Sequence, residues 1–293
     1  MPATLHSLQK APYALACWAG LAGRARRRGA RIIVAHGTPA ASAAALERQL
    51  RYLRRQFRVV PLGDLVDRLD DDEADLDGLA ALTFDDGLRS NVRVAYPILR
   101  RLRVPATFFV CPGLIDAGAW IWTHEARWRL RAMAQDPDLV ESMKRLGLPA
   151  RCAMENGLRR ATAALTPGAA DLEACELAGW DELRALDPAI VTIGSHTLTH
   201  PILPATPSAD LEAEIGGSRA LLEARLQRAV EFFCYPNGDT NRAVTDCVRR
   251  HYRAAVGGNA STVRHGADAY RLPRVNLPGS ALRLAARLHA AVA

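Results

Sequence analysis

The sequence predicts an α/β fold in which helices cover a parallel β-sheet. Short runs rich in β-branched and other apolar residues recur along the 293 residues, and helical patterns lie between them. Alternation of strand and helix is typical of parallel sheets, because a helix carries the chain from one strand to the next. The expected strands are 31–35, 57–60, 79–84, 106–110, 190–194, 231–235, 254–256 and 271–277.

Three stretches carry the apolar stripe of an amphipathic helix. The clearest has Leu46, Leu50, Leu53 and Phe57 at spacings of three and four residues. Such a stripe buries one helix face against the sheet and leaves the other in water. The expected helices are 44–57, 211–226 and 241–252.

The alternation of strand and helix breaks once, between about residues 112 and 188. This stretch contains Trp120, Trp122, Trp128 and Trp180 and several helical runs, but no convincing strand. We interpret it as a helical insertion after one strand. Because the chain shows neither a linker nor a repeat of solenoid period, residues 1–293 are expected to form one domain.

The composition is that of an ordinary globular protein, with 49% hydrophobic and 24% charged residues. The formal net charge of +7 could attract anionic partners. However, an Arg-rich, Ala-rich composition can give a net positive charge that has no binding role. We therefore expect no nucleic-acid partner. The six cysteines form no C-x-x-C pair, which favours reduced structural thiols.

An apolar segment near the start of the chain, residues 11–23, is too short to span a bilayer, which takes about 20 residues. Arg24, Arg26, Arg27 and Arg28 follow this segment, whereas a secretory signal peptide has its cations first. We therefore expect a cytoplasmic protein, with peripheral membrane contact through the N-terminal segment as the alternative. The sequence leaves the oligomeric state open.

Two adjacent carboxylates end one expected strand, in the sequence ALTFDDG at residues 81–87. Two like charges side by side cost Coulomb energy unless a cation or a shared proton relieves it. Taken alone, Asp85 and Asp86 favour a turn in which one carboxylate caps the next helix. A second motif is needed to decide between these interpretations.

Two histidines follow another expected strand, in the sequence GSHTLTHP at residues 194–201. Within one helical turn, His196 and His200 would point the same way and reach one ion. The carboxyl ends of parallel strands share one side of the fold, so both motifs should meet there. Two histidines and one carboxylate suit a divalent ion that acidifies water, and the second aspartate can then act as the base.

The motifs TFDDG and SHTLTHP together resemble those of the polysaccharide deacetylase family, the NodB-homology group of carbohydrate esterases. Three further segments resemble the family's opening strand, its groove motif and its late arginine segment. They are IIVAHG at 32–37, FCYPNG at 233–238 and RLPRV at 271–275. The resemblance covers roughly residues 30–280, with the Trp-bearing insertion outside it.

The resemblance implies a deformed (β/α) barrel of about seven strands, with a catalytic groove at the carboxyl ends of the strands. It implies that Asp85 is the general base and that Arg274 orients this carboxylate and keeps it ionised. By the same resemblance, Asp86, His196 and His200 hold one divalent metal ion, for which zinc is the expected identity.

The FCYPNG motif implies that Tyr235, Pro236 and Asn237 border the substrate, with the Tyr235 backbone N–H helping to hold the oxyanion. The chain departs from the family at its end, where the best-known members carry a Leu-x-His motif that supplies a histidine acid. His289 matches this motif superficially, but it lies in an expected C-terminal helix, on the barrel exterior. His265 follows the strand 254–256 and is the preferred acid.

The implied reaction is metal-dependent hydrolysis of an N-acyl group, usually acetyl, from an amino sugar or a sugar-containing metabolite. An N-acetylated sugar or a related small molecule is then the substrate. Two alternatives stay open: an amidohydrolase acting on a non-sugar N-acyl compound, and a catalytically silent carbohydrate-binding module of the same fold. Trp120, Trp122 and Trp128 are expected either to stack on a sugar or to form a small satellite core.

Overall fold

The computed structural model describes residues 28–258 and 260–290, with the backbone alone for residues 289 and 290. The expected membrane contact of segment 11–23 therefore lies outside the described residues. None of the described helices is both long enough and apolar enough to cross a bilayer.

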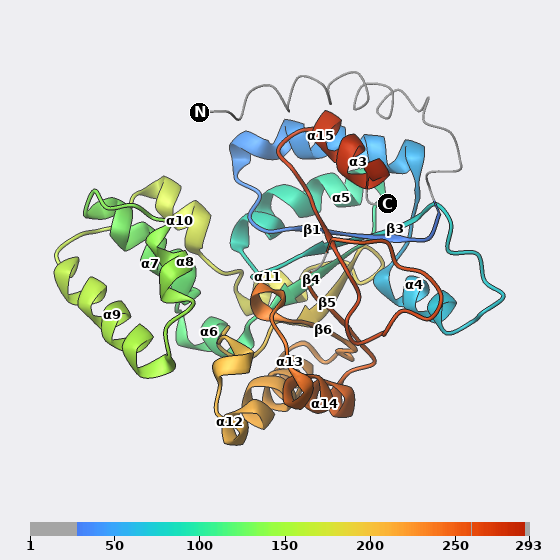
Figure 1. Ribbon diagram of the computed structural model, residues 1–293. Helices are drawn as coiled ribbons and strands as arrows, with labels where there is room; N and C mark the ends of the chain where they lie inside the picture. The colour runs from blue at the N-terminus through green and yellow to red at the C-terminus, as the bar shows by residue number, and fades with distance from the viewer. Residues whose placement is uncertain (1–27, 259, 291–293) are drawn as a thin grey trace.

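The described strands form one parallel sheet, as predicted (Figure 1). Seven of them run in the order β7-β6-β5-β4-β3-β1-β8, and β2 pairs with the beginning of β3. Every residue of β1, β3 and β4 is buried, because helices and loops cover both faces of a parallel sheet. The strands are β1 (Arg31–Ala35), β2 (Arg58–Val59), β3 (Leu79–Phe84), β4 (Ala106–Val110), β5 (Val191–Ser195), β6 (Phe232–Cys234), β7 (Ala254–Val256) and β8 (Val275–Asn276).

The sheet curls until one segment contacts both of its edges. Leu272 forms a parallel bridge with Val256 of β7, and Val275 of β8 pairs with Ile33 of β1. The segment 272–276 thus connects the two edges, which confirms the predicted deformed barrel. It also brings residues that follow β1, β3, β5, β6 and β7 to a common rim.

Helices lie around the outside of the curled sheet (Figure 1), and one apolar core joins them to the outward-facing side chains of the strands. Near β1 and β3 lie α3 (Ala43–Gln56), α5 (Tyr96–Leu102) and α15 (Ala281–Ala290), and near β5 and β6 lie α12 (Ser208–Glu212), α13 (Ser218–Leu226) and α14 (Arg242–His251). The remaining barrel segments are η2 (Ala40–Ser42), α4 (Leu62–Leu69), η3 (Asn91–Ala95), η4 (Leu203–Ala205), η5 (Ala213–Gly217) and η6 (Pro236–Gly238).

The three predicted helices are present, and one of them is interrupted. Helix α3 and helix α14 match the predictions closely, and the Asn241 side chain caps α14 by accepting a hydrogen bond from the Val244 N–H. The predicted helix 211–226 contains the π-helical segment η5 between α12 and α13. Such a π segment often marks a functional site. Glu214 in η5 accepts a hydrogen bond from the Leu198 N–H in the loop after β5.

The helical insertion lies between β4 and β5, as predicted, and its described residues contain no strand. Helices α7 to α10 form a group beside the barrel (Figure 1). This group has a small core in which Trp122, Leu130 and Met143 pack with Ile202 from the loop after β5. The helices are α6 (Pro112–Ala117), α7 (Trp122–Ala132), α8 (Leu139–Met143), α9 (Leu148–Ala161), α10 (Ala169–Cys175) and α11 (Trp180–Arg184).

Candidate metal centre and substrate cavity

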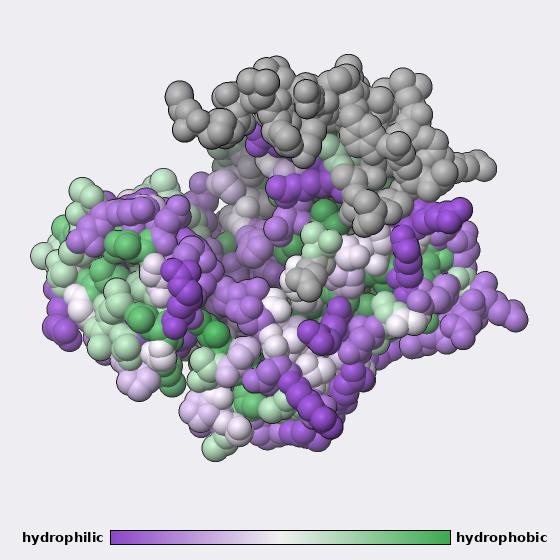
Figure 2. Space-filling model, viewed as in Figure 1, coloured by the Kyte–Doolittle hydropathy of each residue, from purple (hydrophilic) through white to green (hydrophobic). Residues whose placement is uncertain are grey.

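A cavity of about 650 Å³ opens at the carboxyl ends of the strands. Its barrel wall comes from residues that follow β1, β3, β5, β6 and β7 and from β8, and its second wall comes from α7 and α8 of the insertion. Figure 2 shows hydrophilic residues along the hollow between these two parts. The position agrees with the expectation that ligand sites of parallel α/β folds lie at the carboxyl ends of strands.

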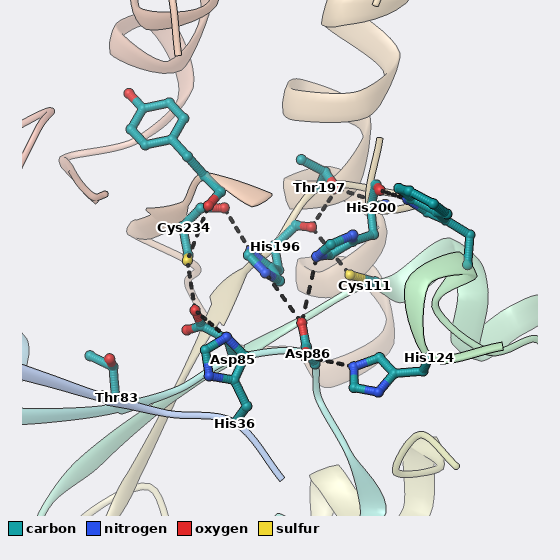
Figure 3. Close-up of polar contacts among 12 residues, drawn as sticks. His36, Thr83, Asp85, Asp86, Cys111, His124, His196, Thr197, His200 and Cys234 are labelled. Carbon is teal, nitrogen blue, oxygen red and sulfur yellow. Dashed lines mark hydrogen bonds and ion pairs between the residues drawn. The ribbon is translucent and has the colours of Figure 1, made fainter. Parts of the chain in front are cut away.

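The aspartate pair leaves β3 in a sharp turn that separates the two carboxylates. Asp86 has a φ of 72° and Gly87 one of 65°, both in the left-handed region. A Cβ at Gly87 would lie 2.9 Å from Val110 Cγ1, so a side chain there would collide with the end of β4. The turn directs Asp85 towards Arg274. It directs Asp86 towards the histidines (Figure 3).

The two histidines converge from a loop and not from the helical turn that we expected. Residues 196–200 are non-helical, and Thr197 and His200 have φ values of 69° and 60°. The His200 N–H donates to Thr197 Oγ1 at 2.9 Å, and Glu214 of η5 accepts from the Leu198 N–H at 3.0 Å. The strained loop is therefore held by its own hydroxyl and by a carboxylate that sequence reasoning missed.

Asp86, His196 and His200 form a buried set of three donors that fits a metal ion. Asp86 Oδ1 lies 3.5 Å from Nε2 of His196 and 3.5 Å from Nε2 of His200, and all three donor atoms lie within 4.8 Å of one another. Ligand atoms about 2.1 Å from a tetrahedral ion are about 3.4 Å apart. The observed separations are too long for good hydrogen bonds but match donors arranged around one ion.

Neighbouring groups orient two of these donors. His196 Nδ1 lies 2.8 Å from the Cys234 carbonyl oxygen, which assigns the ring proton to Nδ1 and leaves Nε2 as a donor to metal. On the other side, His124 Nε2 lies 2.9 Å from Asp86 Oδ2, so that Oδ1 faces the histidines (Figure 3). His124 belongs to α7, and the sequence gave no sign of this contact.

The ionisation states of two donors suit metal binding. Burial opposes ionisation of Asp86, but the hydrogen bond with His124 and the neighbouring histidine rings hold its pKa well below the usual range. Burial lowers the pKa of His200 to about 3. At neutral pH, Asp86 is therefore a carboxylate and His200 a neutral imidazole, the forms in which these residues bind metals.

Asp85 is held by Arg274, as expected from the sequence. Arg274 Nη1 and Nη2 donate to the two carboxylate oxygens at 2.7 and 2.8 Å, and Arg274 Nε donates to the Gly257 carbonyl at 3.1 Å. Burial opposes ionisation of Asp85, but Arg274 lowers its pKa below the usual value. His36 Nε2 lies 3.9 Å from Asp85 Oδ2, at the open side of the cavity.

The structure brings one residue of the Tyr235–Pro236–Asn237 motif to the cavity. Asn237 lines it, with a φ of 57°, whereas the side chains of Tyr235 and Pro236 are buried. The Tyr235 N–H, expected to hold the oxyanion, donates to the Val256 carbonyl at 3.2 Å, and its hydroxyl donates to the Tyr270 carbonyl. The expected oxyanion donor is thus engaged in pairing β6 with β7.

His265 lies at the opposite end of the barrel from the cavity, which corrects the expectation that it is the acid. After β7 the chain crosses to the amino ends of the strands, where Val263 pairs with Ala30 just before β1. His265 Nε2 there contacts the Ala74 carbonyl in the loop before β3, at 2.9 Å. His289 belongs to α15, as expected, but its side chain lies outside the described residues.

Trp120, Trp122 and Trp128 of the insertion do not line the cavity. Trp122 and Trp128 are buried, and the Trp122 Nε1–H donates to the His200 carbonyl at 3.2 Å. Trp120 packs edge to face on Trp128, and both border a separate hollow of about 500 Å³. These contacts favour the satellite-core interpretation over a sugar platform at the candidate metal centre.

Solved structures of deacetylases share this fold. Deacetylase PplD from Streptococcus pyogenes, solved in complex with acetate, has a TM-score of 0.63 at 17% identity over 87% of this chain and 96% of that chain. IcaB from Ammonifex degensii has a TM-score of 0.64 at 20% identity, over 89% and 97% of the two chains. A polysaccharide deacetylase from Bacillus cereus has a TM-score of 0.60 at 16% identity, over 89% and 69%.

Sequence identities this low show a shared fold and do not define the substrate. The search of curated protein sequences found no match to the chain. A sequence model described as polysaccharide deacetylase matches residues 73–256, which is more than half of the chain. The matched segment includes the aspartate pair, the histidine loop and the FCYPNG motif. This chain belongs to the polysaccharide deacetylase family.

Proposed function

We propose that this protein is a metal-dependent hydrolase that removes an N-acyl group, most simply acetyl, from an amino sugar or a sugar-containing metabolite. The observation that carries the proposal is the buried Asp86–His196–His200 set next to the Asp85–Arg274 pair, in one cavity. A silent binding module has no need of a spare carboxylate held beside a complete donor set. Family membership supports an acylated amino sugar as the substrate.

Asp86, His196 and His200 would hold one divalent ion, and their nitrogen and oxygen donors are those that zinc accepts. The chemistry that such an ion supplies is polarisation of the acyl carbonyl and acidification of water. Asp85 accepts the proton of the attacking water, while Arg274 keeps the carboxylate ionised and fixed in direction. Attack at the acyl carbon and cleavage of the C–N bond release acetate and a free amine.

The amine must gain a proton as it leaves, and His36 is the residue that we assign to this step. It follows β1, lines the cavity and lies beside Asp85, and 55% of its side chain is exposed. An exposed imidazole next to the base can deliver a proton to the departing nitrogen and recover it from solvent. His265 is separated from this point by the length of the barrel.

Release of acetate from N-acetylated sugars and from non-sugar N-acetyl amines tests the proposal. We expect turnover of a sugar, its loss after chelation, and its return when zinc or another divalent ion is added. The Asp64→Asn variant, changed at an exposed residue of α4, is the matched control and should keep full activity. Full activity of the chelated protein would overturn the metal mechanism, and turnover of the non-sugar amides alone would overturn the substrate class.

A further inference from the structure

We propose that the insertion wall of the cavity binds an anionic group of the substrate, a phosphate or a carboxylate, through Arg127 and Lys144. This inference rests on the proposed function and names a feature of its substrate. Both cations line the same cavity as Asp85 and Asp86. They come from the insertion, Arg127 from α7 and Lys144 from the end of α8.

A single carboxylate holds the two cations side by side. Glu141 Oε1 accepts from Arg127 Nη2 at 2.7 Å and from Lys144 Nζ at 3.1 Å. The side chains of Arg127 and Lys144 are 31% and 24% exposed, so each faces the cavity without being fully hydrated. Two positive charges against one negative charge leave this cluster with a net charge of +1.

One carboxylate, that of Asp239, faces the cavity from the opposite wall without a cation beside it among the residues that line the cavity. Asp239 lines it together with Asn237 and Gly238. Deeper in the cavity, Arg274 neutralises Asp85, and Asp86 belongs to the candidate metal set. An anionic substituent is therefore repelled by Asp239 and attracted by the insertion wall, which would orient a substrate carrying one.

The chemistry of the two cations suits oxyanions. The planar guanidinium of Arg127 has further N–H donors beside the one that Glu141 accepts, and guanidinium donors match phosphate and carboxylate geometry. Lys144 adds a compact point charge with rotatable donors. It is the sole lysine among the described residues of a chain with 38 lysines and arginines, since the other lysine is Lys10.

Affinity and turnover of matched sugars test the inference in the metal-loaded protein. Calorimetry and acetate release would compare neutral N-acetylglucosamine with N-acetylglucosamine 1-phosphate and with N-acetylmuramic acid, which carries a carboxylate. We expect at least one anionic sugar to bind about tenfold more tightly than the neutral one. The two anionic arms distinguish phosphate from carboxylate.

Variants that remove a positive charge and one that removes the negative charge test whether this cluster binds the anionic group. Arg127→Gln and Lys144→Gln should each lower the affinity for the anionic sugar several-fold and leave the affinity for the neutral sugar unchanged. Glu141→Gln should raise the affinity for the anionic sugar. Arg131→Gln, at an exposed position of the same helix, is the control and should have no effect. The rise expected for Glu141→Gln keeps the test valid even if breaking the cluster loosens the insertion.

Three results would overturn the inference: equal affinity for neutral and anionic sugars, anion binding that all three variants leave unchanged, and a fall in affinity in Glu141→Gln. The second result would mean that the metal ion itself binds the anion. Preferred binding of an anionic sugar without acetate release from any substrate would instead reject the proposed function and keep the anion site.

Discussion

The two walls of the cavity differ in how directly the sequence determines them. On the barrel wall, Asp85, Asp86, His196 and His36 each follow a strand, so the parallel sheet alone brings them to one rim. On the insertion wall, residues such as His124 come from helices whose placement depends on tertiary packing. The barrel therefore supplies the candidate metal donors and the Asp85–Arg274 pair, while the insertion supplies contacts from its own helices, such as that of His124.

The aspartates of the barrel wall should show the largest effects. Asp86→Ala should lose metal binding and activity together, because two histidines are an incomplete protein shell. Asp85→Asn should keep the metal and lose turnover by about 100-fold or more, the contribution of a positioned base. Metal content by mass spectrometry and kcat for both variants provide the measurement. Loss of metal from Asp85→Asn alone would exchange the two roles.

Two histidines at opposite ends of the barrel provide the next comparison. His36→Gln should lower kcat about 100-fold, because leaving-group protonation requires a general acid. His265→Gln should leave kcat unchanged, since His265 contacts the Ala74 carbonyl far from the cavity. Steady-state kinetics with an N-acetylated sugar decide between them. A larger effect at His265 than at His36 would restore the sequence-based expectation.

His124 tests whether the insertion wall acts on the metal centre. Its contact with Asp86 Oδ2 orients the carboxylate, so His124→Ala should weaken metal affinity about tenfold, the lower range for such supporting contacts. His124→Gln should restore part of the affinity, because an amide can donate the same hydrogen bond. Zinc titration by calorimetry gives the result, with Arg131→Gln as the control. Unchanged affinity in His124→Ala would show the contact to be incidental.

The smallest expected effect concerns the stability of the insertion. Glu125 accepts hydrogen bonds from Arg129 and Arg159 at 2.7 to 3.0 Å. Burial opposes its ionisation, but these arginines lower its pKa in the folded protein. The ion pairs of Glu125 with the two arginines therefore stabilise the fold fully at pH values above about 4.3, the pKa of Glu125 in the unfolded chain. This contribution is lost as the pH falls through the lower pKa of Glu125 in the folded protein.

Glu125→Gln should accordingly reduce the free energy of unfolding at pH 7 by roughly 1 kcal/mol, discounted for partial exposure. The difference from the parent protein should shrink at acid pH. Urea denaturation followed by tryptophan fluorescence gives both values, and Glu73→Gln, in an exposed loop, serves as the control. A difference that grows as pH falls would contradict the assigned sign.

Local sequence patterns were enough to predict the strands, the three helices and the position of the insertion. They were also enough to predict the meeting of the aspartate pair with the histidine pair, because strand polarity sends all carboxyl ends to one side. Periodicity could not show that the predicted helix 211–226 contains a π segment. Nor could the spacing of His196 and His200 reveal that a strained loop, and not a helix, brings them together.

By itself the sequence determined the fold class, the family and the residues around the candidate metal centre, because these depend on short segments and on the polarity of parallel strands. Tertiary structure alone decided that the chain after β7 carries His265 to the far end of the barrel. It alone placed His124, Arg127 and Lys144 at the cavity. Those positions depend on side-chain packing between segments distant in sequence, such as Trp122 against the loop of His200, and no local pattern encodes such packing.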